Sequence, residues 1–114
     1  VNAGHNAPIL LRQGGLQELT DGSIALGMLD QLPFVRTGEA AIGGGTLLCY
    51  TDGLVEQEDA YGAAFGTAPL ERALDQFAGA GPGAVNDALI ATFEAHRSGL
   101  PYLDDIALLT CRFA

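Results

Sequence analysis

Three acidic residues stand where apolar segments meet polar chain, and their types and spacing could do chemistry. Asp52 ends a short apolar run and is followed by Gly53, while Asp104 and Asp105 precede the last apolar run. Such runs, bounded by turn residues, predict buried strands, and glycine allows a sharp bend after Asp52. If the two strands run antiparallel side by side, the end of one meets the start of the other. The carboxylates are then expected at one edge of a sheet.

Carboxylates gathered without cysteine or paired histidine favour hard cations with oxygen ligands, chiefly Mg²⁺ or Mn²⁺. Two such ions about 3.5–4 Å apart can clamp a phosphoryl group for in-line attack by water. Each motif also has a plainer interpretation. Asp52–Gly53 can be an ordinary turn, and Asp104–Asp105 a solvated strand start. The residues alone leave both interpretations open.

Composition restricts the class of protein. With 114 residues, 48% hydrophobic and 17% charged, the chain fits one globular domain. The net charge of −9, with five arginines and no lysine, argues against a nucleic-acid partner and suits cations, a basic partner surface or simple solubility. No apolar run reaches about 18 residues, so neither a membrane span nor a signal peptide is expected. Cys49 and Cys111 are predicted to be buried free thiols in a reducing cytoplasm, not zinc ligands.

The elements that would position the acidic residues follow from periodicity. A helix capped by Thr67 is expected to bury Leu70, Ala73, Leu74 and Phe77, which recur at helical spacing. A second helix is expected to bury Val85, Leu89 and Phe93, and both helices would cover one face of the sheet. The expected strands are 9–12, 16–19, a central strand from Thr46 that ends at Asp52–Gly53, and 103–112, with short ones at 34–35 and 39–42. The apolar segment 24–29 is expected to pack under the sheet edge.

Three stretches in this order and spacing resemble a known family. They are NAGHNAP at 2–8, YTDGLVE at 50–56 and DDIALL at 104–109, and Ala25–Gly27 and Phe65–Gly66 fit the same pattern. Together they resemble the C-terminal half of the SpoIIE/RsbU-like branch of the PPM metal-dependent serine/threonine phosphatases. The resemblance implies an α+β fold, part of a four-layer α-β-β-α sandwich of two antiparallel sheets flanked by helices. It also implies two Mn²⁺ or Mg²⁺ ions in the complete domain.

The resemblance further implies an activity and a site. The activity is removal of phosphate from phosphoserine or phosphothreonine, on an anti-anti-sigma type regulator in bacterial signalling, in the cytoplasm. By motif position Asp52 and Asp104 look like metal ligands. Asp105 is a second candidate beside Asp104, and Gly53 is the turn residue that lets Asp52 point into the cleft.

Two further residues, His5 and Glu56, have competing interpretations, and a third, His96, has one. His5 and Glu56 are possible accessory residues near the metals. A single histidine in a polar turn is also an ordinary structural hydrogen-bonding residue, and Glu56 equally fits an exposed acidic turn. His96, near a helix end, is expected to be an unremarkable surface residue.

The sequence departs from the family pattern in ways that affect activity. Gly44–Gly45–Thr46 stands where a Gly-Asp pair is usual, and Ala107 stands where threonine is usual; both are expected to affect only turns and packing. The resemblance also implies that the chain, which begins at Val1, lacks the N-terminal half of the domain with its metal-binding aspartates. The fragment alone is therefore expected to be inactive, and to pair with the missing half or with a second copy. The alternatives are a non-catalytic phosphatase-like interaction module and a structural half-domain.

Overall fold

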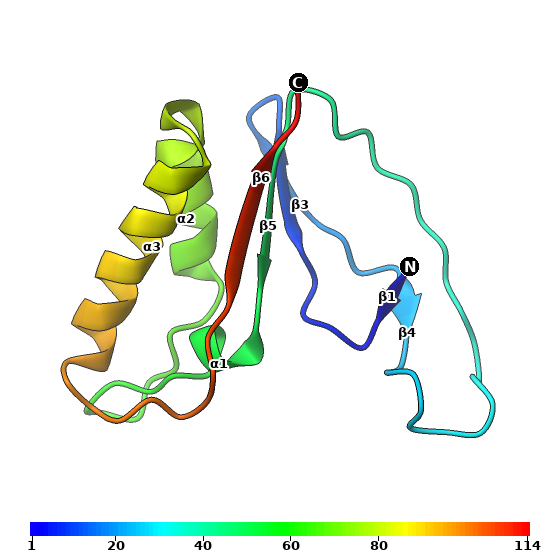
Figure 1. The fold of residues 1–114 in the computed structure, drawn as a ribbon, viewed down its shortest axis with the longest axis horizontal. Coiled ribbons are helices and arrows are strands. Elements are labelled where there is room, and N and C mark those ends of the chain that lie inside the picture. The colour runs from blue at the N-terminus through cyan, green and yellow to red at the C-terminus, as the bar shows by residue number, and fades with distance from the viewer.

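A computed structural model describes residues 1–114 as a four-stranded antiparallel sheet with two long helices on one face and a small two-stranded sheet beside it (Figure 1). The α+β class expected from the sequence is confirmed. The elements in chain order are β1 (Asn2–Ala3), β2 (Ile9–Arg12), β3 (Gly15–Glu18), β4 (Gly22–Ser23), β5 (Thr46–Tyr50), α1 (Asp52–Val55), α2 (Ala68–Phe77), the 3₁₀ turn η1 (Ala78–Ala80), α3 (Pro82–Arg97) and β6 (Leu108–Arg112).

The central sheet has the strand order β3-β2-β5-β6, and every neighbouring pair is antiparallel. Tyr50 at the end of β5 pairs with Leu108 at the start of β6, and Leu48 pairs with Ile9 at the start of β2. The chain therefore enters β2, leaves β5 and enters β6 at the same end of the sheet, which we call the site end. This register brings the three motif segments together (Figure 1).

The expected hairpin is present, with a two-residue loop. Gln13 and Gly14 both have positive φ, 51° and 76°. Two left-handed residues in succession form the turn that best matches the twist of the flanking strands. Gly15 lies in β3 and not in the loop, as Arg12 pairs with it.

The hydrophobic core lies between the sheet and the helices α2 and α3, as expected (Figure 1). Five of the residues predicted from helical spacing to be buried in α2 and α3 are at most 3% exposed, and a sixth, Ala73, is 6% exposed. Phe77 is the exception, because it is 38% exposed while Ala78, which follows it, belongs to the core. The core residues are Ile9, Leu48, Tyr50, Leu54, Phe65, Leu70, Ala73, Leu74, Ala78, Val85, Leu89 and Phe93.

Replacing Leu89 by alanine is expected to lower the free energy of unfolding by about 2–5 kcal/mol, because the side chain is fully buried and leaves a cavity. Its neighbour Ile90 is 51% exposed, so Ile90→Ala is expected to change the stability by about 0.5 kcal/mol or less. Urea unfolding of the two variants measures the difference. Equal losses would contradict the assignment of the buried face of α3.

The opposite face of β5 and β6 carries apolar residues that no element covers. Successive strand residues alternate between faces, so Leu47 and Cys49 point away from the helices, as do Leu109 and Cys111, their partners in β6. Leu109 is 58% exposed. Both cysteines are free, as predicted, but they are half-buried and not buried, because they lie on this uncovered face. Partial burial raises the pKa of the Cys49 thiol, with a smaller contribution from Cys111.

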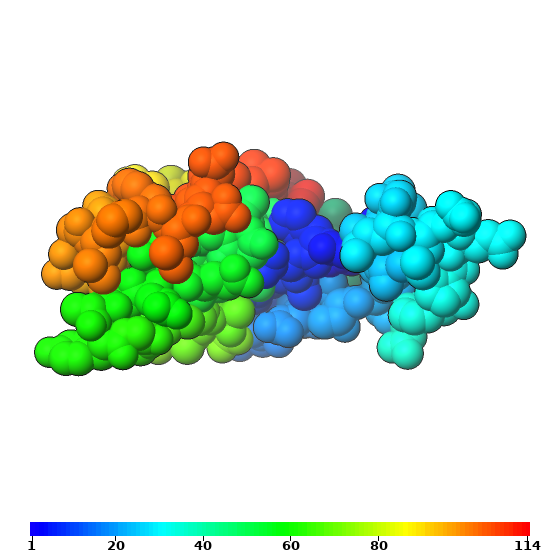
Figure 2. Space-filling model, turned by 90° about the horizontal axis from the view of Figure 1, so that it is seen from below, coloured from blue at the N-terminus to red at the C-terminus, as the bar shows by residue number.

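Residues 24–42 differ most from expectation. The segments 34–35 and 39–42 form no strand, and the apolar segment 24–29 does not pack under the sheet edge. Leu26 and Met28 are more than 70% exposed, and Figure 2 shows this part of the chain projecting from the body. The physical reason is that strand propensity reflects packing on a covered surface, which these residues do not find here.

The small parallel pair of β1 and β4 was not predicted, because two-residue strands leave no periodic signal. The pairing requires Gly22, since a methyl group there would lie 1.9 Å from the carbonyl oxygen of Asn2. No helix of the structure is long and apolar enough to cross a membrane.

Candidate active site

Asp52 lies immediately beyond β5, at the site end of the sheet. It begins the single-turn helix α1, in which the Glu56 amide donates to the Asp52 carbonyl (2.9 Å), so Asp52 and Gly53 form the first part of a helical turn. The Gly53 amide donates to Asp52 Oδ1 (2.9 Å), and the Asp52 side chain is exposed. The short helix thus fixes the carboxylate at the surface of the sheet end.

Asp104 and Asp105 lie against this turn, as the antiparallel register predicts. A methyl group added at Gly53 would lie 2.3 Å from the carbonyl oxygen of Asp105, so the two backbones touch where glycine permits it. Asp104 accepts a hydrogen bond from the Asp105 amide through Oδ1 (2.7 Å), and both side chains are exposed. The structure therefore brings together the two segments that carry Asp52, Asp104 and Asp105. The strand expected over 103–112 begins only at Leu108.

Thr51 joins the two segments, and the sequence reasoning did not single it out. Its amide donates to the Ala107 carbonyl (3.2 Å), its hydroxyl donates to the Asp105 carbonyl (3.3 Å), and the Ala107 amide donates to the hydroxyl (2.9 Å). The one feature of the sequence that could have pointed to Thr51 is its place directly before Asp52. Its side chain extends the pairing of β5 and β6 by one step toward the acidic residues.

Thr51→Val, which keeps the shape but removes the hydroxyl, is expected to cost about 0.5–1.5 kcal/mol of stability because the exposed Ala107 amide loses its protein acceptor. Thr51→Ser keeps the hydroxyl and is the matched control. Thermal unfolding of both variants checks the difference. A valine variant as stable as the wild type would contradict the role of the hydroxyl, and a serine variant as unstable as the valine variant would show that keeping the hydroxyl is not sufficient.

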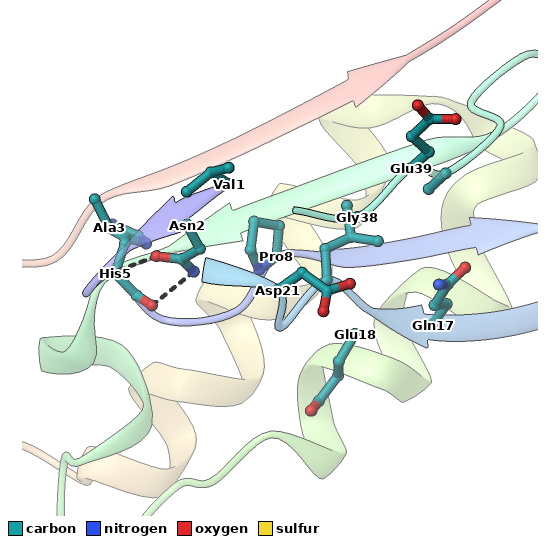
Figure 3. A pocket seen from close by; sticks show the side chains of 12 residues that line it. Val1, Asn2, Ala3, His5, Pro8, Gln17, Glu18, Asp21, Gly38 and Glu39 are labelled. Carbon is teal, nitrogen blue, oxygen red and sulfur yellow. Dashed lines mark hydrogen bonds between the residues drawn. The ribbon is translucent and has the colours of Figure 1, made fainter. Parts of the chain in front are cut away.

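His5 lies at the same end of the sheet, in the turn before β2. Its amide donates to Asn2 Oδ1 (2.8 Å), Asn2 Nδ2 donates to the His5 carbonyl (2.8 Å), and its ring Nδ1 lies 3.0 Å from the Asn6 carbonyl (Figure 3). These are contacts of a structural hydrogen-bonding residue. An accessory role remains a prediction for His5 and also for Glu56, which is exposed at the end of α1.

An open pocket of about 390 Å³ lies beside His5 and not between the candidate ligands (Figure 3). Its acidic lining residues come from β3 and the loops that follow it. The acidic lining residues are Glu18, Asp21 and Glu39.

The acidic groups at the site end form only part of a metal site. No group of three or more His, Cys, Asp or Glu side chains is placed to hold a metal ion. Exposed carboxylates nevertheless fit Mg²⁺ or Mn²⁺ in chemistry, since Mg²⁺ in enzymes is often held by one or two carboxylates together with waters and substrate phosphate. The nearby Asp59 uses its carboxylate within its own loop. It accepts hydrogen bonds from the amides of Ala63 (2.9 Å) and Tyr61 (2.8 Å), which hold its pKa below the usual range.

His96 is not the plain surface residue that its position near a helix end suggested. It is half-buried, its Nε2 lies 3.0 Å from the Gln57 carbonyl, and its ring packs edge-on against Phe65 with 5.3 Å between centroids. His96 is half-buried because the loop after α1, which contains Gln57, folds back over the end of α3.

The fold matches part of a PP2C-type phosphatase domain. The family model described as Stage II sporulation protein E (SpoIIE) matches residues 1–114, and the chain belongs to this family. The resemblance drawn from the three sequence motifs is thereby confirmed.

Solved structures agree with the family over nearly the whole chain. The SiaA-PP2C domain of Pseudomonas aeruginosa is 26% identical with a TM-score of 0.75, over 98% of this chain and 44% of that one. Two structures of the phosphatase domain of the cell fate determinant SpoIIE from Bacillus subtilis share the fold, at 16% and 17% identity with TM-scores of 0.65 and 0.67. The matches cover 95% and 96% of this chain, and 48% and 47% of the two Bacillus subtilis chains. The chain thus spans less than half the length of each. Among curated proteins, no relative matches it.

Proposed function

We propose that this chain is the C-terminal half of a metal-dependent protein serine/threonine phosphatase domain. The observation that carries the proposal is the contact between the turn at Asp52–Gly53 and the backbone of Asp104–Asp105, which gathers the acidic residues at one end of the sheet. Membership of the SpoIIE family supports the reaction class. By "complete domain" we mean this chain together with the N-terminal half that the proposal requires.

In this proposal Asp52 and Asp104 are metal ligands from this half, with Asp105 as a further candidate. Gly53 has no side chain that would separate the two segments, and Thr51 ties them together. Bound Mn²⁺ or Mg²⁺, two ions in the complete domain, would supply the positive charge that holds and polarises a phosphoryl group. The remaining ligands come from the other half, because this chain supplies too few.

The other half would also complete the fold. Half-buried and exposed apolar side chains on the uncovered face of β5 and β6 are suited to pack against a second antiparallel sheet. The result would be the four-layer α-β-β-α sandwich, with α2 and α3 as one outer layer. The coverage of less than half of each solved relative supports this arrangement.

The proposed substrate is a phosphoserine or phosphothreonine of a small regulator protein, of the anti-anti-sigma type found in bacterial signalling, and the proposed location is the cytoplasm. A regulatory substrate is in keeping with the solved SpoIIE domain of the same fold, which is described as the phosphatase domain of a cell fate determinant. An acidic chain with a net charge of −9 is suited to a partner surface with basic residues.

The test is an assay of phosphate release from a phosphoserine-bearing regulator protein by the complete domain. Release that requires Mn²⁺ or Mg²⁺ and stops on addition of EDTA supports the proposal. A complete domain that binds the regulator but releases no phosphate with either metal would instead favour the non-catalytic interaction module.

A further inference from the structure

The loop that carries the acidic pair has no backbone support of its own. Residues 101–106 form no hydrogen bond from backbone to backbone. Backbone polar groups in a folded protein need partners, and four of those in this loop bond to side chains: the carbonyls of Pro101 and Asp105 and the amides of Leu103 and Asp105. Two of these side chains, Thr51 and Gln57, belong to the segment around Asp52.

Gln57 makes the larger set of contacts. Its side-chain amide donates to the carbonyls of Pro101 (3.2 Å) and Glu58 (3.2 Å), and its Oε1 accepts the amide of Leu103 (3.2 Å). Three hydrogen bonds use both ends of the amide group. Two of the three attach the loop, at Leu103 and Pro101, which lie one and three positions before Asp104.

Burial and anchoring make Gln57 suited to hold a loop. Its side chain is only 1% exposed, whereas Tyr102 and Leu103 are 56% and 60% exposed. Its own carbonyl accepts the Phe65 amide (2.8 Å) and lies 3.0 Å from His96 of α3. A polar side chain is buried only when its hydrogen bonds are satisfied. Gln57 is therefore fixed to the core on one side and to the exposed loop on the other.

We propose that Gln57 is a positioning residue that holds Asp104 and Asp105 beside Asp52 through its contacts with the Pro101–Leu103 segment. The proposal rests on the proposed function of the site end as a metal site. Residues that orient metal ligands without touching the metal commonly change metal affinity by about 10–100-fold. The local pattern does not indicate this role, since Gln57 lies among acidic residues in what looks like a solvated turn.

The first test needs neither metal nor substrate. Amide hydrogen exchange of the metal-free complete domain is expected to show protection at Leu103. In Gln57→Met, which keeps the side-chain volume but removes the three hydrogen bonds, the Leu103 amide is expected to exchange at least about 10-fold faster. The Phe113 amide, which donates to the Gly45 carbonyl at the far end of the sheet, is expected to keep its rate and so report that the fold is intact. An unprotected Leu103 amide in the wild type would overturn the proposal even if the variant does not fold.

The second test is the Mn²⁺ requirement of phosphate release. Gln57→Met is expected to raise the half-saturating Mn²⁺ concentration about 10-fold, with kcat at saturating Mn²⁺ within about twofold of the wild type. Gln76→Met, at an exposed position of α2, is the matched control and is expected to change neither value. An unchanged Mn²⁺ requirement in Gln57→Met would overturn the positioning role and leave the proposed function standing. A wild-type complete domain that releases no phosphate with Mn²⁺ or Mg²⁺ would instead overturn the proposed function.

Discussion

Asp52→Asn in the complete domain is expected to lower Mn²⁺-dependent phosphatase activity by at least about 100-fold. Asparagine keeps the size of the side chain and can still accept the Gly53 amide, so the fold of α1 should survive. The charge that a hard divalent cation requires is lost, and a direct ligand is expected to matter more than the 10–100-fold typical of residues behind the ligands. Phosphate release over a range of Mn²⁺ concentrations measures the loss.

The control for this variant is Asp75→Asn, an exposed aspartate of α2 away from the site end. It removes the same charge from the same acidic chain, so it separates a ligand effect from a change in net charge. Asp104→Asn is expected to behave like Asp52→Asn. Activity within a few-fold of the wild type in either of the two site variants would rule out that residue as a metal ligand.

Gly53→Ala is expected to lower both stability and activity, through geometry and not through charge. The added methyl group would lie 2.3 Å from the Asp105 carbonyl oxygen and 3.2 Å from the Asp104 carbonyl carbon. Since these are backbone atoms, the two segments must move apart, and overpacking of this kind costs about 1–3 kcal/mol. The carboxylates would move apart with their backbones, so metal affinity should fall as well.

A matched control for this glycine lies in the first turn of α3. A methyl group at Gly83 meets nothing within 4 Å, and alanine favours a helix over glycine, so Gly83→Ala is expected to raise the stability by about 0.5–1 kcal/mol. Thermal unfolding of both variants, with and without Mn²⁺, gives the comparison. A Gly53→Ala domain with wild-type stability and metal requirement would contradict the close contact between the two segments.

The parts of the fold that the sequence predicted well are those with strong local periodicity. The burial of Leu70 and Leu74 in α2, and of Leu89 in α3, follows from helical spacing. The meeting of Asp52 with the acidic pair also followed from sequence, because the register of two antiparallel strands fixes which of their ends are adjacent.

The parts that could not be predicted depend on tertiary contacts. The apolar residues near Met28 look like packing residues, yet they are exposed, because no partner surface lies beside them. Gln57 looks like a solvated residue, yet it is buried, because the loop before Asp104 returns to it after 44 residues. The local pattern of apolar and polar residues predicts neither the exposure of the segment near Met28 nor the burial of Gln57. The roles of Asp52 and Asp104 as ligands remain a prediction.

The measurement that tests the central claim most directly is a double-mutant cycle of Asp52→Asn and Asp104→Asn in the complete domain, read out as Mn²⁺ affinity by calorimetry and as phosphatase activity. Residues that act as one unit are strongly non-additive. If both aspartates serve one metal centre, the double variant should lose about as much as the worse single variant. Independent losses that multiply, or Mn²⁺ binding that survives in the double variant, would contradict the account.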